Sequence, residues 1–231
     1  LVHLARADGV LKASRRDLGP AVSGGRNAAT TVSATLWIAR KAGIGIFATG
    51  GLGGVHRGAA QSFDISTDLD ELARADGCLV VCSGAKTILD LPATLEALET
   101  RGVPVVGYRT SELPGFTSRS SGLPIEHRVD DPNQAARLVA VHRLLGLSGA
   151  VVLTQQVPEA HAPDDSLMQR ALDAALALAE RKGISGKELT PFLLAQIHET
   201  TGGVSRSANA ALIVANAALA GLVAAALAAS A

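Results

Sequence analysis

Short apolar runs, each bounded by Gly, Pro or polar residues, recur along the first two thirds of the chain. Runs rich in Val and Ile are typical of strands that are buried on both faces of a sheet. We therefore predict four strands, "IGIFATGG" (44–51), "LVVCSGA" (79–85), "VPVVGY" (103–108) and "AVVLTQQ" (150–156). The longer stretches before and between them predict helices at 31–42, 66–75, 87–101 and 131–145.

Three further helical stretches follow without an intervening strand, at 165–183, 190–201 and 205–228. Alternating strands and helices bury a sheet between helical layers. We predict an α/β fold, a single three-layer α/β/α domain over 1–231 with a central, largely buried sheet and an additional C-terminal helical layer. The loop at 109–130 is the longest irregular stretch, and loops of this length are often functional lids.

The last helix is apolar enough, by length alone, to raise the question of a membrane span. Its apolar residues are mostly Ala, and Asn209 and Asn216 interrupt them. Asparagines seven residues apart fall on one helix face, which suits a helix that is buried in protein or lines a site. We therefore expect no membrane partner.

Composition narrows the class of protein further. Lys and Arg number 21 and balance 21 Asp and Glu, so charge gives no reason to expect nucleic acid as a partner. Aromatic residues make up 3%, which disfavours a platform for stacking single-stranded bases. Two cysteines, Cys78 and Cys82, lie four residues apart at one apparent strand and complete no zinc site. We expect buried free thiols in a cytoplasmic protein.

Lys86 stands alone in "LVVCSGAKTILD", between a predicted strand and a predicted helix. It can be a lysine whose ammonium simply reaches solvent from a strand end. Alternatively, the positive end of the helix dipole and the apolar surroundings favour the neutral amine over the ammonium. A neutral amine can form a Schiff base with a carbonyl compound.

Carboxylates and hydroxyls cluster in "SFDISTDLDEL". Ser66, Thr67 and Asp68 can form the capped start of a helix, whereas Asp64 lies before that start and is not explained by capping. Carboxylates beside hydroxyls are also hard oxygen ligands that suit manganese or magnesium. Both interpretations can hold for different residues of this segment.

Two segments could bind an anion. In "FATGGLGGVHRG", four glycines beside His56 and Arg57 can expose backbone N–H groups, although a tight turn explains the glycines equally well. The run "LKASRRD" contributes Lys12, Arg15 and Arg16, which can hold a phosphate or form a solvated face.

Long motifs in order along nearly the whole chain resemble the pseudouridine-5′-phosphate glycosidases, including the indigoidine-synthase-A-like proteins. They are "KASRRDL", "ATTVSATLWIA", "FATGGLGGVHRG", "DISTDLDELAR", "VVCSGAKTILDLPATLEALETRGVPVVGY" and "GKELTPFLLAQIHETTGGVSRSANAALIVANAA". The resemblance implies trimeric α/β/α enzymes that use manganese. It also implies reversible cleavage of the carbon–carbon glycosidic bond of pseudouridine 5′-phosphate to uracil and ribose 5-phosphate.

The resemblance also implies roles for individual residues. Lys86 matches the nucleophile that forms an imine with the ring-opened ribose, and Asp64 matches the ligand of Mn²⁺, with Mg²⁺ as the alternative. The matches to substrate contacts are Lys12, the backbone at Val32, Ser66, Thr67 and Asp68, and, around the ribose phosphate, His56 and Asn209.

One departure from the family pattern concerns the acid that protonates uracil. The family places this glutamate before the "SRRD" motif, and here the first glutamate is Glu71, beyond the metal motif. The chain also opens on Leu1, so we expect an N-terminally truncated or processed product. The alternative hypothesis is a catalytically reduced relative that binds a sugar phosphate without turnover.

Overall fold

The computed structural model describes residues 2–229. Five parallel strands form one sheet in the order β3-β4-β7-β5-β6. Their bounds are β3 Ile46–Ala48, β4 Leu79–Cys82, β5 Val105–Tyr108, β6 His127–Val129 and β7 Val151–Thr154. Each predicted strand is present but shorter than its apolar run. The strand β6 lies inside the predicted loop 109–130 and was missed, because two of its three residues are exposed and form no apolar run.

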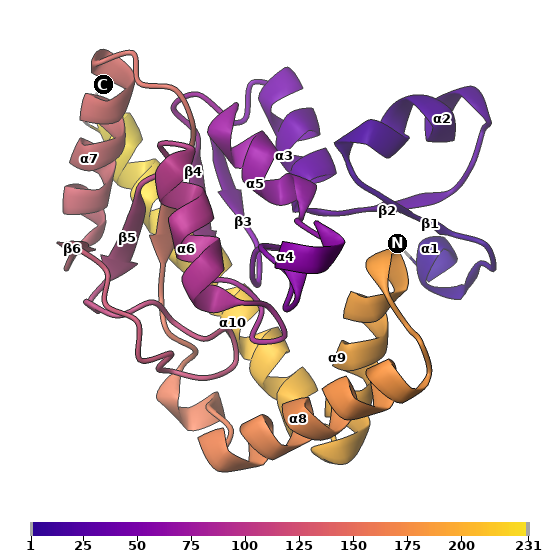
Figure 1. Cartoon of the computed structure of the whole chain (residues 1–231). Coiled ribbons are helices and arrows are strands. Elements are labelled where there is room, and N and C mark those ends of the chain that lie inside the picture. The colour runs from indigo at the N-terminus through magenta and orange to yellow at the C-terminus, as the bar shows by residue number, and fades with distance from the viewer. Residues whose placement is uncertain (1, 230–231) are drawn as a thin grey trace.

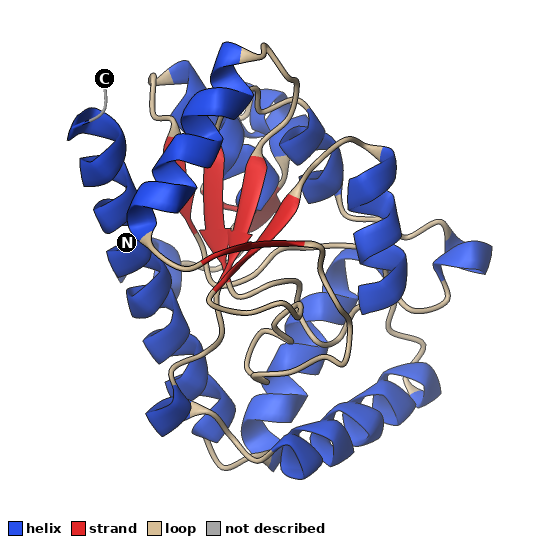
Figure 2. Cartoon of the chain, turned by 90° about the vertical axis from the view of Figure 1, so that its left-hand side faces the viewer, coloured by secondary structure: helices blue, strands red, loops and turns tan. Residues whose placement is uncertain are grey.

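Helices cover both faces of this sheet (Figure 2). Side chains alternate along β4, so Val80 and Cys82 face one helical layer and Leu79 and Val81 face the other. The first layer consists of α3 Val32–Lys41, α5 Thr67–Ala73 and α6 Leu91–Thr100, and the second of α7 Pro132–Leu144 and α10 Val204–Ala229. The predicted three-layer α/β/α arrangement is confirmed.

The helix that follows Lys86 starts later than the predicted residue 87. The Asp90 side chain accepts the N–H of Ala93 at 3.0 Å, which is the bond that an N-cap makes. Pro92 stands in the first turn, where its missing N–H is not needed. The helix α6 therefore begins at Leu91, and the residues between 86 and 90 form a turn.

The additional helical layer contains two of the three late helices. Figure 1 shows α8 (Asp165–Arg181) and α9 (Leu189–Thr200) along the lower side of the molecule, below the sheet. Their apolar faces pack on Ala85, Ile88 and Leu89, which follow the carboxyl end of β4. The layer therefore supports the turn that contains Lys86.

The third late helix, α10, belongs to the α/β/α sandwich instead. Leu219, Ala220 and Val223 pack against the sheet and α7, as expected for a core helix. Among the described residues it is the one helix long and apolar enough to cross a membrane, with a mean hydropathy of 2.2 in its most apolar window. Only 22% of that window is buried, so one face of α10 is core and the other is exposed.

The N-terminal residues form a small unit that the sequence did not predict. Figure 1 shows it at the right, beside the sheet domain. Two strands pair in parallel outside the main sheet. They were not predicted because strands of three residues leave no recognisable pattern in the sequence. The elements of this unit are α1 Val2–Arg6, β1 Leu11–Ala13, η1 Arg15–Asp17, α2 Leu18–Ser23 and β2 Ala28–Thr30. Three short helical elements occur elsewhere in the chain, α4 Ala59–Ser62, η2 Glu159–His161 and η3 Gly186–Glu188.

The stretch at 109–125 is a packed loop. Leu113, Phe116 and Thr117 are buried, and the Phe116 N–H donates to the Ser83 carbonyl at 2.9 Å. Gly84 has φ +77° where this loop crosses it, a conformation that glycine adopts without strain. The loop is thus fixed against the end of β4 rather than standing free as a lid.

Both cysteines are buried free thiols, as predicted. Burial raises the pKa of the Cys78 thiol, and burial raises the pKa of Cys82 to about 12. A thiol rather than a thiolate at neutral pH is unreactive, so both residues belong to the core.

Candidate active site

Lys86 lies in a turn whose backbone is tied to the glycine-rich loop after β3. Its N–H donates to the Leu52 carbonyl at 3.2 Å, and its carbonyl accepts the Leu89 N–H at 3.0 Å. The Asp90 N–H donates to the Val55 carbonyl at 2.9 Å. Lys86 therefore precedes the first residue of α6 and does not stand at the helix start, contrary to prediction.

A cavity of about 470 Å³ opens between this turn, the N-terminal unit and the segment before α5. Eight of the nine predicted site residues line it, although they come from five segments of the chain. They are Lys12, Val32, His56, Asp64, Ser66, Thr67, Asp68 and Lys86. We take this cavity as the candidate active site.

Asp68 was predicted to contact substrate, but its buried carboxylate already holds two backbone groups. One oxygen accepts the Ser33 N–H and the other accepts the Gly53 N–H, both at 2.8 Å. The Asp68 N–H in turn donates to the Ser66 hydroxyl, which caps α5. Asp68 therefore joins the starts of α3 and α5 to the glycine-rich loop.

Ser33 connects the same region to the N-terminal unit. Its buried hydroxyl accepts the Arg15 N–H at 3.2 Å and lies 3.2 Å from the Thr67 hydroxyl. The Arg15 guanidinium also pairs with Glu71 at 2.8 Å, and Glu71 is buried. These contacts fix the segment that follows Lys12 relative to α3 and α5.

The glycine-rich loop does not form the open anion nest considered from the sequence. The Gly53 N–H is taken by Asp68, as described above. A Cβ atom on Gly53 would lie 2.7 Å from an Asp68 oxygen, closer than real Cβ contacts come. Glycine is needed there because the loop passes directly over the Asp68 carboxylate.

His56 and Asp64 meet at one wall of the cavity. The His56 N–H donates to the Asp64 carbonyl at 3.0 Å, and His56 Nδ1 lies 3.9 Å from Asp64 Oδ2. Nδ1 is buried and has no hydrogen-bond partner. Burial lowers the pKa of His56; the Asp64 carboxylate raises it, and the Lys12 and Lys86 ammonium groups lower it further.

Asp64 and His56 Nδ1 suit a hard or borderline metal ion. A carboxylate oxygen suits divalent manganese or magnesium, and a neutral imidazole nitrogen is a common ligand of divalent metal ions. Among the described residues no group of three or more His, Cys, Asp and Glu side chains could hold a metal ion. A metal here would thus take its remaining ligands from water or substrate, as Mg²⁺ and similar ions commonly do.

Asn209 is the predicted site residue that the cavity does not include. Its side-chain oxygen lies against Gly50, 3.2 Å from where a Cβ on that glycine would be. Asn216, seven residues further along α10, is buried. Its amide NH₂ donates to the Thr49 carbonyl at 2.8 Å and its side-chain oxygen accepts from Gln155 at 2.9 Å. Asn216 therefore links the residues that follow β3 and β7 by hydrogen bonds. Its spacing from Asn209 indicated a buried helix face but not these partners.

The basic run near the N-terminus divides into two functions. Arg16 lines the cavity and its side chain is 67% exposed, so it can reach a ligand. Arg15 instead forms the ion pair with Glu71, in which Arg40 also takes part at 3.4 Å. Of the three basic residues in this run, Lys12 and Arg16 line the cavity and stay candidates for binding a phosphate.

Several lining residues were not predicted from the sequence. Thr30 belongs to the short strand β2 and Thr31 stands at the start of α3. The pairing of β2 with β1 leaves no recognisable pattern in the sequence. Phe63 and Ile65 flank Asp64 and were not predicted, because isolated apolar residues are common in loops. The others are Ser14, Asp17, Ala29, Gly53, Leu89, Gly186 and Thr190.

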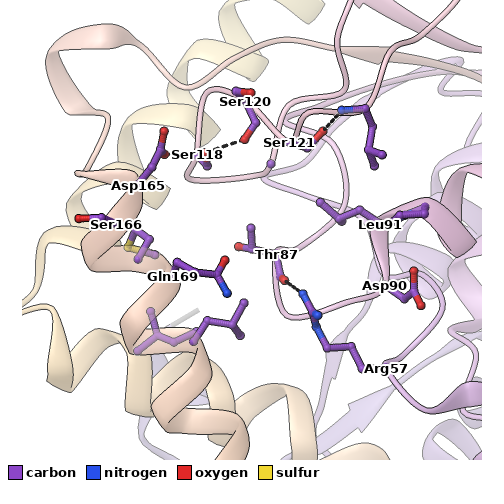
Figure 3. Close-up of a pocket in the computed structure, with 16 residues that line it drawn as sticks. Arg57, Thr87, Asp90, Leu91, Ser118, Ser120, Ser121, Asp165, Ser166 and Gln169 are labelled. Atoms are coloured by element: carbon purple, nitrogen blue, oxygen red, sulfur yellow. Dashed lines mark hydrogen bonds between the residues drawn. The ribbon is translucent and has the colours of Figure 1, made fainter.

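A second cavity, of about 630 Å³, is lined in part by Thr87 and Asp90, which belong to the turn that contains Lys86 (Figure 3). Arg57 and Thr87 line it, with the Arg57 guanidinium 3.4 Å from the Thr87 carbonyl. The Ser118 hydroxyl donates to Asp165 at 2.6 Å. This cavity contains none of the nine residues predicted above, although Arg57 of the glycine-rich segment lines it, and its polar groups partly satisfy one another.

Comparison with known proteins places this geometry in a family. The family model described as "Indigoidine synthase A like protein" matches residues 1–226. A pseudouridine-5′-phosphate glycosidase of Herpetosiphon aurantiacus is 55% identical over 97% of this chain and 74% of its own length. One from Caldanaerobacter subterraneus subsp. tengcongensis is 52% identical over 90% of this chain and 67% of its own.

Solved structures agree with these relatives. The crystal structure of the prealnumycin C-glycosynthase AlnA in complex with ribulose 5-phosphate matches with a TM-score of 0.91 and 40% identity, over 99% of this chain and 75% of that one. An indigoidine synthase A-like protein from Thermotoga maritima matches with a TM-score of 0.84 and 37% identity, over 94% and 71%. The chain therefore belongs to the indigoidine synthase A-like protein family.

Proposed function

We propose that this chain is a pseudouridine-5′-phosphate glycosidase, which reversibly cleaves the bond between ribose C1 and uracil C5. The observation that carries the proposal is the cavity that holds Lys86 together with Lys12, His56 and Asp64. Relatives that are 52% and 55% identical carry this name, and a related structure binds ribulose 5-phosphate, a pentose phosphate. The reaction would belong to the lyases, acting on a small molecule.

The chemistry needs a nucleophile because a carbon–carbon bond to uracil has no good leaving group. In the proposed reaction Lys86 Nζ bonds to C1 of the ribose while the bond from C1 to the ring oxygen breaks, and the proton that the nitrogen loses passes to that oxygen. The nitrogen lone pair then forms the imine as the C1–C5 bond breaks. The bonding electrons go to uracil C5, which takes a proton. Water hydrolyses the imine, which releases ribose 5-phosphate and restores the amine.

Substrate recognition in this proposal rests on the charged and polar lining. Lys12 and Arg16 supply cations for the phosphate. Val32 is the first residue of α3, where the first backbone N–H groups of a helix have no partner within the helix. Ser66 and Thr67 line the same cavity; the Ser66 hydroxyl caps α5 and the Thr67 hydroxyl lies 3.2 Å from that of Ser33, and both can still take part in hydrogen bonds with the sugar. Asn209 keeps only an indirect part, through Gly50.

Manganese is the metal that we propose, with magnesium as the alternative. Asp64 would hold it, and the unpartnered His56 Nδ1 offers a second donor. A bound divalent ion would polarise an oxygen of the substrate.

The proton for uracil C5 is assigned to no residue of the chain described here. Glu71 is buried between Arg15 and Arg40 and does not line the cavity. The first glutamate of the sequence therefore supports the N-terminal unit rather than the chemistry.

Borohydride trapping tests the proposal. We expect that incubation with ribose 5-phosphate and Mn²⁺, followed by reduction and peptide mass spectrometry, places a pentose-phosphate adduct on Lys86. The exposed Lys41 provides an internal control and should stay unmodified. Parallel reactions without metal show whether Mn²⁺ is needed for the adduct.

The outcomes separate the two functions that the sequence left open. An unmodified Lys86 in folded protein would remove the nucleophile from the proposal. An adduct on Lys86 without release of uracil from pseudouridine 5′-phosphate would favour the catalytically reduced, sugar-phosphate-binding relative.

We also propose a cytoplasmic homotrimer. Its support is exposed apolar side chains on two helices that pack together, Val214 (70%) and Leu222 (58%) on α10 and Leu144 (84%) on α7. Such exposed apolar area commonly marks a protein interface. Sedimentation equilibrium should give three times the chain mass of 23.5 kDa, and Val214→Asp should lower it. A monomer in the unaltered protein would contradict the proposal.

A further inference from the structure

The rim of the active-site cavity carries a large aromatic side chain that is turned toward solvent. Phe63 lines the cavity and is 81% exposed, although phenylalanine is usually buried. Ile65, two residues on, also lines the cavity and is 41% exposed. With Asp64 between them, these side chains make an apolar rim next to the proposed metal ligand.

The backbone holds Phe63 at this position with some strain. Its φ is +54°, in the left-handed region that a bulky residue rarely adopts. The residues around it are fixed, because the Phe63 N–H donates to the Ala59 carbonyl at 2.8 Å and Ile65 pairs with Val55 across an antiparallel bridge. A strained backbone and an exposed phenyl ring are both unfavourable for the protein by itself. Such outliers point to a function.

The lining of the cavity has cationic side chains and an apolar rim, and the proposed substrate likewise has a sugar phosphate and a flat base. Lys12, Arg16 and Lys86 are cationic and suit a sugar phosphate, which is polar throughout. Uracil is flat, uncharged and has two faces that gain most from contact with an aromatic ring. Phe63 is the one Phe, Tyr or Trp side chain among the described residues that line the cavity, and the smaller His56 imidazole lies at the wall beside Asp64.

We propose that Phe63, supported by Ile65, is the platform on which the uracil ring of the substrate stacks. This inference rests on the proposed function and adds the residues that recognise the base. It assigns Phe63 to the affinity for uracil and not to the formation of the imine on Lys86.

The synthesis direction tests this assignment, because uracil and ribose 5-phosphate are then separate substrates. We expect Phe63→Ala to raise KM for uracil between about fivefold and a hundredfold, the range measured for base–aromatic stacking. KM for ribose 5-phosphate and the yield of trapped adduct on Lys86 should stay within twofold. Phe63→Tyr keeps the ring and should restore KM for uracil.

The matched control is Val22→Ala, since Val22 is 80% exposed but lies away from the cavity lining. It should leave both KM values unchanged. Equal changes in the two KM values for Phe63→Ala, or no change in either, would overturn the platform. A loss of oligomer mass with loss of all activity would also overturn it, because Phe63 would then belong to a contact between copies.

A further measurement separates this inference from the proposed function. If the unaltered protein makes no pseudouridine 5′-phosphate, saturation-transfer NMR with uracil still compares it with Phe63→Ala. A uracil signal that Phe63→Ala abolishes supports the platform although the catalytic proposal has failed. A signal that the substitution leaves intact, or no signal in the unaltered protein, refutes the platform.

Discussion

Lys86→Ala should lower kcat for cleavage of pseudouridine 5′-phosphate by at least about a thousandfold, because it removes the only atom proposed to bond to ribose C1. Lys86→Arg should be as inactive. A guanidinium keeps the positive charge but stays protonated and cannot form the imine. Release of uracil, followed by its absorbance, measures kcat, and the thermal unfolding of each variant shows that it has folded.

Lys41→Ala is the matched lysine control. Lys41 is exposed at the end of α3, where its ammonium lies over the Trp37 ring. It should retain kcat, since neither Lys41 nor Trp37 lines the cavity. A Lys86→Arg variant with more than a tenth of the original kcat would mean that the residue acts as a charge and that the imine mechanism is wrong.

Asp68→Asn should destabilise the fold and weaken substrate binding together. The new amide can accept only one of the two N–H groups that the carboxylate now holds, and its NH₂ opposes the other. A buried N–H group without an acceptor costs about 1–3 kcal/mol. We expect a loss of about 1–3 kcal/mol in the free energy of unfolding, seen as a fall of about 2–12 °C in Tm.

The same substitution at Asp70 is the control. Asp70 stands on the solvent side of α5, 53% exposed, and pairs with Arg101 at 2.8 Å. A surface ion pair contributes about 0–1 kcal/mol, so Asp70→Asn should leave Tm and KM nearly unchanged. If Asp68→Asn raises KM for ribose 5-phosphate at an unchanged Tm, Asp68 contacts substrate directly and its role as a link between segments is wrong.

Much of the sandwich could be predicted because its signals are local. The apolar runs at 79–85 and 150–156 contain β4 and β7, which are buried on both faces and must be apolar throughout. Asp131 and Pro132 mark the start of α7 by chemistry within one turn of helix. The exception was the start of α6, where the apolar pattern extends into the turn that contains Lys86 and only the cap at Asp90 shows the boundary.

The short elements were not predictable for the opposite reason. The three residues of β1 are a strand only because those of β2, at 28–30, lie beside them. The same holds for β6, which is a strand because β5 supplies its hydrogen bonds. Pairing between distant segments leaves no periodic pattern in so few residues.

The site residues followed a similar division. Family motifs in the sequence indicated Lys86, Asp64 and their neighbours, and eight of nine predicted residues line one cavity. The distinction between residues that face the cavity and residues that hold it in shape was not available from those motifs. Asp68 and Arg15 were candidates for ligand contact, yet their partners are Ser33, Gly53 and Glu71.

The sequence by itself determined the layered α/β class, the buried thiols and the family. Buried strands, helix caps and long motifs can be recognised from residues that are close together along the chain. Only the tertiary structure decided which polar groups are already satisfied, where the turn at Lys86 ends, and that Phe63 stands at the rim beside Asp64. Hydrogen-bond partners and exposure depend on segments that are far apart along the chain. Folding brings them together through long-range packing that no local pattern records.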